Sequence, residues 1–174
     1  MMILVVFIFD VHPVPCGSPR WTNQERTMAT STQEEENKEL VRRFHQALDD
    51  HELDRVDEFL AENYTTGIYR SGTEEEIGGR DGMKALWEEY LVAFPDLTGE
   101  FTELIAEGDR VAYFRADSGT HEGEFRGIAP TGNDITFEYA GYYIIEDGKI
   151  VHGTALGNIM SLLKQMDVDL PLAT

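Results

Sequence analysis

The segment GKIVHGTALGNIMSLLKQM, residues 148–166, begins with the alternation of a β-strand and ends with helical spacing. In an extended chain one face carries His152, Thr154, Leu156 and Asn158, because strand side chains alternate. A face of this kind could form the polar floor of a ligand cavity. Asn158 could instead cap the helix that follows it, since asparagine is a preferred N-cap residue. The sequence leaves both interpretations of Asn158 open.

His121 is a second candidate for chemistry, because it follows Gly119 and Thr120 at the end of a predicted strand. Histidine titrates near physiological pH, so a histidine at a cavity mouth could act as a general base. The alternative is an exposed histidine on the rim that is hydrogen-bonded to the connecting loop. The residues around His121 do not decide between the two.

Three charged residues lie on two successive predicted strands. Arg115 and Asp117 share one face of the first strand, and Glu138 lies on the next. Asp117 or Glu138 could act as a base, and a buried Arg115 could orient a carboxylate or an enolate. Residues in this arrangement more often form an ion pair on the solvent-facing side of a sheet, and we favour that interpretation from the sequence.

Aromatic residues are spread over the predicted helices and strands. A cavity lined by them would suit a flat hydrophobic ligand, with phenol hydroxyls as its few polar contacts. Some of these side chains must instead form ordinary core. The predicted ligand-binding set is Tyr64, Trp87, Tyr90, Phe114, Phe125, Tyr139, Tyr143 and Thr154.

The predicted elements place helices before strands. Apolar residues at helical spacing predict helices over residues 33–50, 53–60, 80–95 and 159–166. Alternating segments predict strands over residues 63–70, 97–106, 110–121, 135–145 and 149–157, with a loop at 71–79. This order indicates the α+β class, with a curved antiparallel sheet wrapped around N-terminal helices as a cone with an internal pocket.

Charge excludes several classes of partner. The chain has 33 acidic and 14 basic residues, for a formal net charge of −19. Nucleic acid is excluded because its recognition requires clustered basic groups, and anionic membrane surfaces are disfavoured for the same reason. Only 4 residues are lysine, and an acid-rich, lysine-poor composition is typical of proteins from salt-loving organisms. The alternative is an ordinary acidic cytosolic protein.

Cysteine and histidine usage argue against a metal or disulfide framework. Cys16 is the single cysteine, so no intrachain disulfide is possible, which agrees with a reducing cytoplasm. The 5 histidines form no pair at i, i+4, so no metal site is predicted.

The N-terminal residues differ from the rest of the chain. The apolar run Met1–Phe9 is shorter than the roughly 20 residues that span a bilayer, and Asp10 interrupts it. We expect translation of the native protein to begin at Met28, and the alternative is that these residues are a membrane anchor or a signal peptide. The predicted organisation is therefore an extension over residues 1–30 and one domain over residues 31–170.

Five segments resemble a known family in their order and separation. They are LVRRFHQALDDHELDRVDEFLAENY, GGRDGMKALWEEYLVAFPDL, LIAEGDRVA, GTHEGEFRGIAPTGNDI and IEDGKIVHGTALGNIMSLLKQM. Over about residues 37–166 the chain resembles the SnoaL-like polyketide cyclase (ester cyclase) family, which belongs to the nuclear-transport-factor-2-like superfamily of α+β cones.

The resemblance implies a reaction and two catalytic positions. The founding cyclases close a ring by an intramolecular aldol reaction without metal or organic cofactor, using an Asp on the last strand as the general acid/base. Asn158 occupies that position here, while His121 is retained, and these two are the predicted catalytic residues. An early His-Asp pair of the family falls at Thr66 and Gly67 and is also missing. A carboxamide cannot take the proton, although it could donate a hydrogen bond to an enolate oxygen.

Two hypotheses follow for function. The first is a SnoaL-like protein that binds a small hydrophobic carbonyl compound and performs cofactor-free acid/base chemistry as a cyclase, isomerase or hydrolase. The second is a non-catalytic ligand-binding or dimerisation module on the same fold, because the family Asp is Asn158 here. The resemblance further implies a homodimer formed through the outer face of the sheet.

Overall fold

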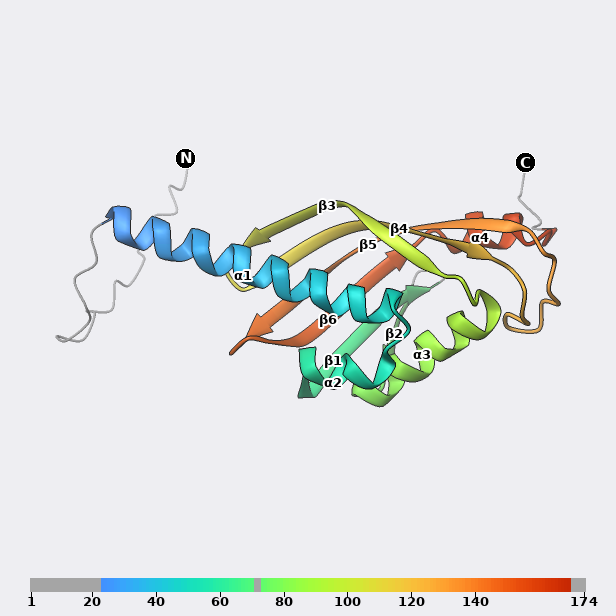
Figure 1. Cartoon of the computed structure of the whole chain (residues 1–174), viewed down its shortest axis with the longest axis horizontal. Coiled ribbons are helices and arrows are strands. Elements are labelled where there is room, and N and C mark those ends of the chain that lie inside the picture. Colours follow the sequence, from blue (N-terminus) through green and yellow to red (C-terminus); the bar gives the residue numbers. More distant parts are fainter. Residues whose placement is uncertain (1–22, 71–72, 170–174) are drawn as a thin grey trace, which may run out of the picture.

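The structure is a computed structural model that describes residues 23–70 and 73–169 (Figure 1). Its helices are α1 (Asn23–Asp49), the 3-10 turn η1 (Leu53–Arg55), α2 (Val56–Phe59), α3 (Gly79–Ala93) and α4 (Ile159–Gln165). Its strands are β1 (Leu60–Arg70), β2 (Thr73–Ile77), β3 (Thr98–Glu107), β4 (Arg110–Thr120), β5 (Asp134–Glu146) and β6 (Lys149–Gly157). The predictions for residues 1–22, including the apolar run and Cys16, lie outside the described residues.

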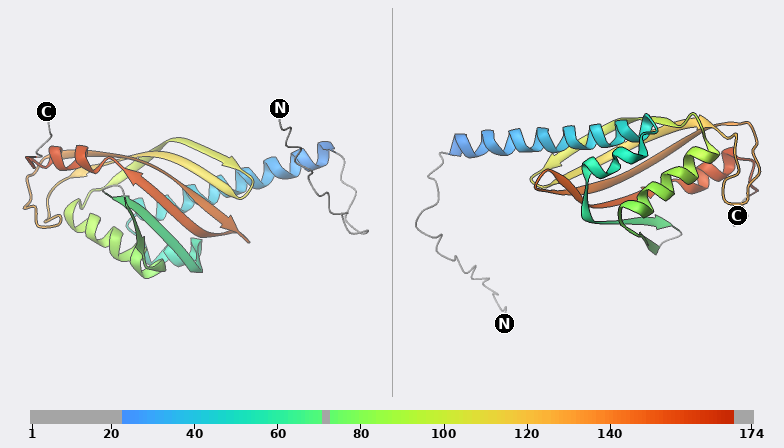
Figure 2. Two further views of the ribbon diagram at one scale, coloured as in Figure 1. Left: turned by 180° about the vertical axis from the view of Figure 1, so that it is seen from behind. Right: turned by 60° about the horizontal axis from the view of Figure 1, so that its bottom comes forward.

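One curved sheet organises the molecule. Its six described strands are ordered β2-β1-β6-β5-β4-β3, and every neighbouring pair is antiparallel except β1 with β6, which is parallel. Helices α1, α2 and α3 lie together on one side of this sheet, while α4 follows β6 at the far end (Figure 2). The predicted α+β cone is confirmed.

Three local predictions were wrong. Helix α1 begins at Asn23, ten residues before the predicted start at 33, and is continuous across residue 30. Residues 73–77 form the edge strand β2 where a loop was predicted, because backbone pairing with β1 outweighs the low strand propensity of the sequence TEEEI. The second helix is only η1 followed by one α-helical turn, since Leu60 already starts β1.

Helix α1 is held against the sheet by its second half. Val41, Phe44 and Leu48 are buried at helical spacing and form the centre of the core under the sheet. Asn37 donates from Nδ2 to the Gly108 carbonyl at 2.9 Å, which ties the helix to the turn between β3 and β4. The earlier part of α1 extends past the ends of the strands (Figure 1).

The buried residues separate into two clusters. The first joins α1, α2, β1 and the middle of the sheet around Phe44, and the second joins the end of α3 to α4 around Phe94 and Leu162. None of the helices that the structure describes combines the length and apolar character needed to cross a bilayer. The space between the two clusters contains the candidate site.

Candidate functional site

A cavity of about 100 Å³ lies between the two clusters and is lined by residues of α1, α3, α4 and the concave face of the sheet. Most of its wall is apolar. The apolar and small residues that line it are Met83, Leu86, Trp87, Phe94, Leu97, Ile135, Phe137, Gly153, Ala155, Gly157 and Leu162. Residues with polar side chains also line it, by their side chains or their backbone, namely His45, Tyr64, Thr66, Tyr90, Tyr113, Asp117, Tyr139, Tyr143 and Thr154.

The last strand supplies the cavity with small residues. In β6, Gly153 and Gly157 pair with the cavity-lining Tyr143 and Tyr139 of β5, so they share the concave face. A Cβ at Gly153 would stand 2.7 Å from the Tyr64 hydroxyl, and one at Gly157 would stand 2.2 Å from the Phe137 ring. These glycines therefore leave room for the aromatic side chains that shape the cavity.

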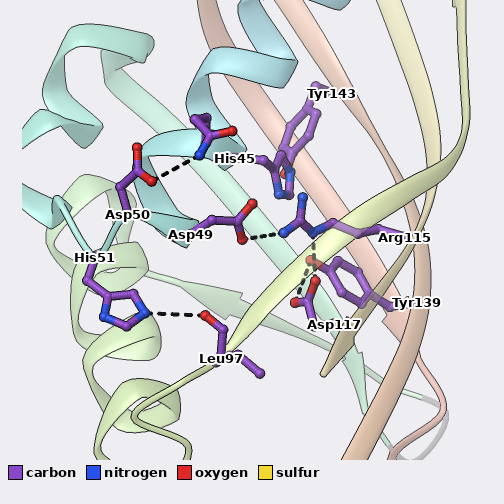
Figure 3. A network of polar contacts seen from close by, with 10 residues as sticks. His45, Asp49, Asp50, His51, Leu97, Arg115, Asp117, Tyr139 and Tyr143 are labelled. Atoms are coloured by element: carbon purple, nitrogen blue, oxygen red, sulfur yellow. Dashed lines mark hydrogen bonds and ion pairs between the residues drawn. The ribbon is translucent and has the colours of Figure 1, made fainter. Parts of the chain in front are cut away.

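Arg115 joins two carboxylates from different elements, and one of them, Asp117, lines the cavity (Figure 3). Its Nε donates to Asp117 Oδ1 at 2.6 Å, and its Nη2 donates to Asp49 Oδ1. Asp49 is the last residue of α1, whereas Arg115 and Asp117 lie two apart on β4. Arg115 and Asp117 are each 3% exposed, so this ion pair is buried.

Asp117 is the carboxylate that reaches the cavity. Tyr139 donates its hydroxyl hydrogen to Asp117 Oδ2 at 3.0 Å, while Arg115 holds Oδ1. Burial raises the pKa of Asp117 above its usual range, and the charge of Arg115 together with both hydrogen bonds only partly offsets this. A carboxylate held in this way can take up and return a proton closer to neutral pH than an exposed one.

His45 and Tyr143 form a second polar pair on the cavity wall. His45 Nε2 lies 2.8 Å from the Tyr143 hydroxyl oxygen, and His45 Nδ1 is buried without a hydrogen-bond partner among the described residues. Burial, and then the nearby charge of Arg115, lower the pKa of His45, so its ring is neutral. An orphaned N–H costs more than an orphaned acceptor, which favours the tautomer with hydrogen on Nε2. His45 then donates to Tyr143, whose own hydroxyl hydrogen can bond the neighbouring Tyr113 hydroxyl or a ligand oxygen.

The tyrosines around these pairs are neutral donors. Burial raises the pKa of Tyr113 to about 12. Burial also raises the pKa of Tyr139 and Tyr143 well above the usual value for a phenol. Neutral phenols in an apolar wall can donate hydrogen bonds to a developing oxyanion.

Comparison of the sequence with models of known families shows the family to which the chain belongs. Residues 38–166 match the family model of the SnoaL-like polyketide cyclases. The chain belongs to the SnoaL-like polyketide cyclase family. No curated protein matches this SnoaL-like chain by sequence.

Solved structures share the SnoaL-like fold. AclR from Streptomyces galilaeus, described as a proposed hydroxylase, is 29% identical over 77% of this chain and 97% of its own, with a TM-score of 0.68. IdmH from Streptomyces antibioticus, a proposed polyketide cyclase, is 24% identical over 76% and 99%, with a TM-score of 0.66. A proposed SnoaL-like polyketide cyclase from Jannaschia sp. CCS1 is 18% identical over 79% and 95%, with a TM-score of 0.70.

Six of the eight residues predicted to bind ligand line the SnoaL-like cavity: Tyr64, Trp87, Tyr90, Tyr139, Tyr143 and Thr154. Thr154 pairs with Tyr142 on the outer face, so it contributes its backbone, and its carbonyl oxygen accepts from the Tyr113 hydroxyl at 3.5 Å. Phe114 lies on the outer face of the sheet and is 53% exposed. Phe125 is buried in the second cluster, packed against Tyr90 with ring centroids 5.3 Å apart, and does not line the cavity.

The two residues predicted to be catalytic lie away from the cavity wall. Asn158 is exposed and caps α4, since its Oδ1 accepts from the Ser161 N–H at 3.2 Å. His121 is buried, and its Nδ1 accepts from the Thr131 N–H at 3.3 Å, which holds the connection between β4 and β5. The structure therefore supports the cap interpretation of Asn158. His121 is bonded to the connecting loop but is not exposed.

The favoured interpretation of the charged strand residues was wrong in part. Arg115 and Asp117 do form an ion pair, but it faces the core on the same side as Val111 and Tyr113. Glu138 lies on the outer face and is exposed. The alternation along RVAYFRAD could have predicted that Arg115 and Asp117 are buried, because it places them on the same strand face as the apolar residues Val111 and Tyr113.

Helix α1 contributes two site residues that sequence reasoning missed. His45 follows Val41 by four residues on the apolar stripe of α1, and Asp49 follows His45 by four. Their spacing alone predicts the same helix face. Nothing in the spacing predicts that Arg115 stands opposite them. Among the described residues no group of three or more His, Cys, Asp or Glu side chains is placed to hold a metal ion.

Substitution of Gly99 on β3 tests how tightly the ion pair of Arg115 and Asp117 is packed against the backbone of this strand. A Cβ at Gly99 would stand 1.9 Å from Asp117 Oδ1 and 2.8 Å from Arg115 Nη2, so Gly99→Ala must displace one of them. We expect Gly99→Ala to lower the free energy of unfolding by about 1–3 kcal/mol, measured by urea denaturation.

Gly78→Ala is the control for this substitution. A Cβ at Gly78 meets no atom within 4 Å, and its φ of −63° suits any residue, so we expect little change in stability. Equal unfolding free energies for the two variants would contradict the tight packing of Gly99 against Arg115 and Asp117.

Proposed function

We propose that this SnoaL-like protein binds a small, neutral, hydrophobic carbonyl compound in the cavity and transfers protons on it without a metal or organic cofactor. The observation that carries the proposal is Asp117, a buried carboxylate that reaches a mostly apolar cavity. Asp117 takes the place of the missing family Asp in this proposal, since Asn158 caps α4.

The proposed step is an enolisation followed by carbon–carbon bond formation. Asp117 accepts a proton from the carbon next to a carbonyl group, and the C–H electron pair becomes the double bond of an enolate. The Tyr143 hydroxyl, backed by His45, donates a hydrogen bond to the enolate oxygen. The enolate carbon then attacks a second carbonyl of the same molecule, whose oxygen receives the proton from Asp117. The step is balanced without a co-reactant, and isomerisation is the same process with the proton returned to a different carbon.

Charge in the wall supports a neutral ligand. No lysine or arginine is among the described residues that line the cavity, and Arg115, which lies behind the lining residue Asp117, is engaged by the carboxylates of Asp49 and Asp117. A ligand carboxylate or phosphate would enter next to surplus negative charge in a low-dielectric site, which is unfavourable. The volume of about 100 Å³ limits the ligand to a compact molecule unless the wall opens.

Proton abstraction can be measured on a surrogate. Acetophenone has exchangeable methyl protons next to its carbonyl group, and their loss in D₂O is followed by proton NMR. We expect the wild-type protein to exceed buffer exchange and Asp117→Asn to lose about 100-fold of that rate. Glu138→Gln is the matched control, because Glu138 is an exposed carboxylate on the outer face and should retain the wild-type rate.

A second variant separates chemistry from folding. Tyr139→Phe leaves the Arg115–Asp117 ion pair in place and removes a hydrogen bond that lowers the pKa of Asp117. The acid limb of its exchange profile should therefore move to higher pH. Binding of acetophenone without exchange in any variant would establish the non-catalytic binding module instead. Absence of binding in NMR titrations would overturn the proposed ligand class.

The outer face of the sheet supports a homodimer. Exposed Ile105, Phe114 and Leu156 lie on this face, and a shallow groove of about 550 Å³ runs between Phe114 and Leu156. Apolar side chains gathered on one sheet face are typical of a protein interface. We propose that a second copy of the chain covers it.

Phe114→Glu tests the homodimer by sedimentation velocity. The wild-type chain should sediment as a dimer, while the variant should shift to monomer because a carboxylate would be buried against an apolar partner. Val92→Glu is the control, since Val92 is also an exposed apolar residue, at 65%, but lies on α3, away from this face. A monomeric wild-type chain, or an unaffected variant, would contradict the interface.

The charge of −19 supports function in a salt-rich cytoplasm. Salt screens repulsion between surface carboxylates, so raising NaCl from about 0.05 to about 2 M should raise the unfolding midpoint by about 5 °C in thermal denaturation. The same change in sorbitol, which adds no ions, controls for solute effects that do not depend on charge. An unchanged or lower midpoint in NaCl would contradict adaptation to salt.

A further inference from the structure

We propose that Asp49, at the end of α1, is a positioning residue that sets the protonation of Asp117 by sharing Arg115 with it. The catalytic consequence of this inference rests on the proposed function. The sharing itself is a property of the folded protein and can be measured without any activity.

Arg115 lies between Asp49 and Asp117, so its single positive charge is shared by two carboxylates. Nη2 is bound to Asp49 and Nε to Asp117, and the side chains of Arg115, Asp49 and Asp117 are 2%, 11% and 4% exposed (Figure 3). Fully ionised, the three groups carry a net charge of −1. An uncompensated buried charge is energetically costly. The surplus negative charge of the two carboxylates therefore favours the binding of one proton by Asp49 or Asp117.

Asp49 and Arg115 are the charged side chains among the groups packed around Asp117. Helix α1 also contributes His45, which is neutral, and β3 contributes Gly99 opposite Asp117. Strands β4 and β5 and helix α3 contribute the phenols Tyr113, Tyr139, Tyr143 and Tyr90. Among these neighbours, therefore, the balance between Asp49 and Arg115 determines the electrostatic environment of Asp117.

Asp49 acts on Asp117 in two ways that have the same sign. The negative charge of Asp49 makes a negative charge on Asp117 less favourable. Asp49 also binds Nη2 of Arg115, so the positive charge of Arg115 is shared between two carboxylates and does not compensate Asp117 alone. Both effects raise the affinity of Asp117 for a proton. A base acts best when its pKa lies near the working pH, so Asp49 would keep Asp117 from being too weak a base.

The position of Asp49 makes a purely helical role a poor explanation. A carboxylate in the last turn of a helix is repelled by the negative end of the helix dipole. Arg115 compensates this cost at Asp49. Asp50, the next residue, is exposed and instead accepts a hydrogen bond from Gln46 of the same helix at 3.0 Å, so it is a neighbouring carboxylate that is not bound to Arg115.

The test is a titration of the Asp117 side-chain carboxyl carbon by carbon-13 NMR. In Asp49→Asn, we expect the apparent pKa of Asp117 to fall by about one unit, because the repulsion is removed and Arg115 is no longer shared. Asp49→Glu should retain a value close to the wild type. Asp50→Asn is the matched control and should shift the titration of Asp117 far less than Asp49→Asn does, because Asp50 is exposed and is not bound to Arg115.

The wild-type titration provides a second measurement if Asp49→Asn does not fold. Two carboxylates that share one cation titrate as a pair, so the carbons of Asp49 and Asp117 should report the same two steps. Independent single-step curves for Asp49 and Asp117, or an Asp117 titration unchanged in Asp49→Asn, would overturn the inference.

The pH profile of acetophenone exchange separates this inference from the proposed function. If both hold, the acid limb in Asp49→Asn moves to lower pH together with the NMR titration, and the maximal rate falls. A shifted titration with no exchange in the wild-type protein would overturn the catalytic proposal and leave the sharing of Arg115 intact.

Discussion

The buried charge of Arg115 constrains how this cone is assembled. A guanidinium that is removed from water is tolerated only with carboxylates in good geometry, and the two that meet it come from β4 and from the end of α1. The requirement fixes the last turn of α1 against the concave face of the sheet. It also explains why glycine stands at position 99, where any side chain would enter the space of the ion pair.

The cavity exists because large and small residues are divided between facing elements. Aromatic side chains project into the cavity from α3, β4 and β5. The small residues Gly153, Ala155 and Gly157 of β6 lie on the same concave face and leave room for them. Bulky residues on β6 would fill the same space and join the two core clusters into one. The polar groups of Asp117 and His45 are thereby held in an apolar wall, where burial raises the pKa of the carboxyl and lowers that of the imidazole.

Local periodicity predicted the bounds of the strands better than it predicted which strands pair in the sheet. The strands at β4, β5 and β6 lie close to their predicted bounds, because alternation and turn residues are properties of short segments. The strand β2 was missed, since its sequence has no strand pattern and its backbone is held by β1. The parallel pairing of β1 with β6 was also missed, because it joins residues about 90 apart in the chain.

The sequence by itself determined the α+β class, the family and most of the aromatic residues of the cavity, because these follow from local patterns of residue type. It also determined that β6 alternates, but not which of its faces is inward. Only the tertiary structure decided that Gly153 rather than Thr154 faces the cavity and that Asn158 caps a helix. It also decided that His45 meets Tyr143 and that Asp49 meets Arg115. The physical reason is that burial and charge compensation depend on what packs opposite a residue, and that partner is distant in the chain.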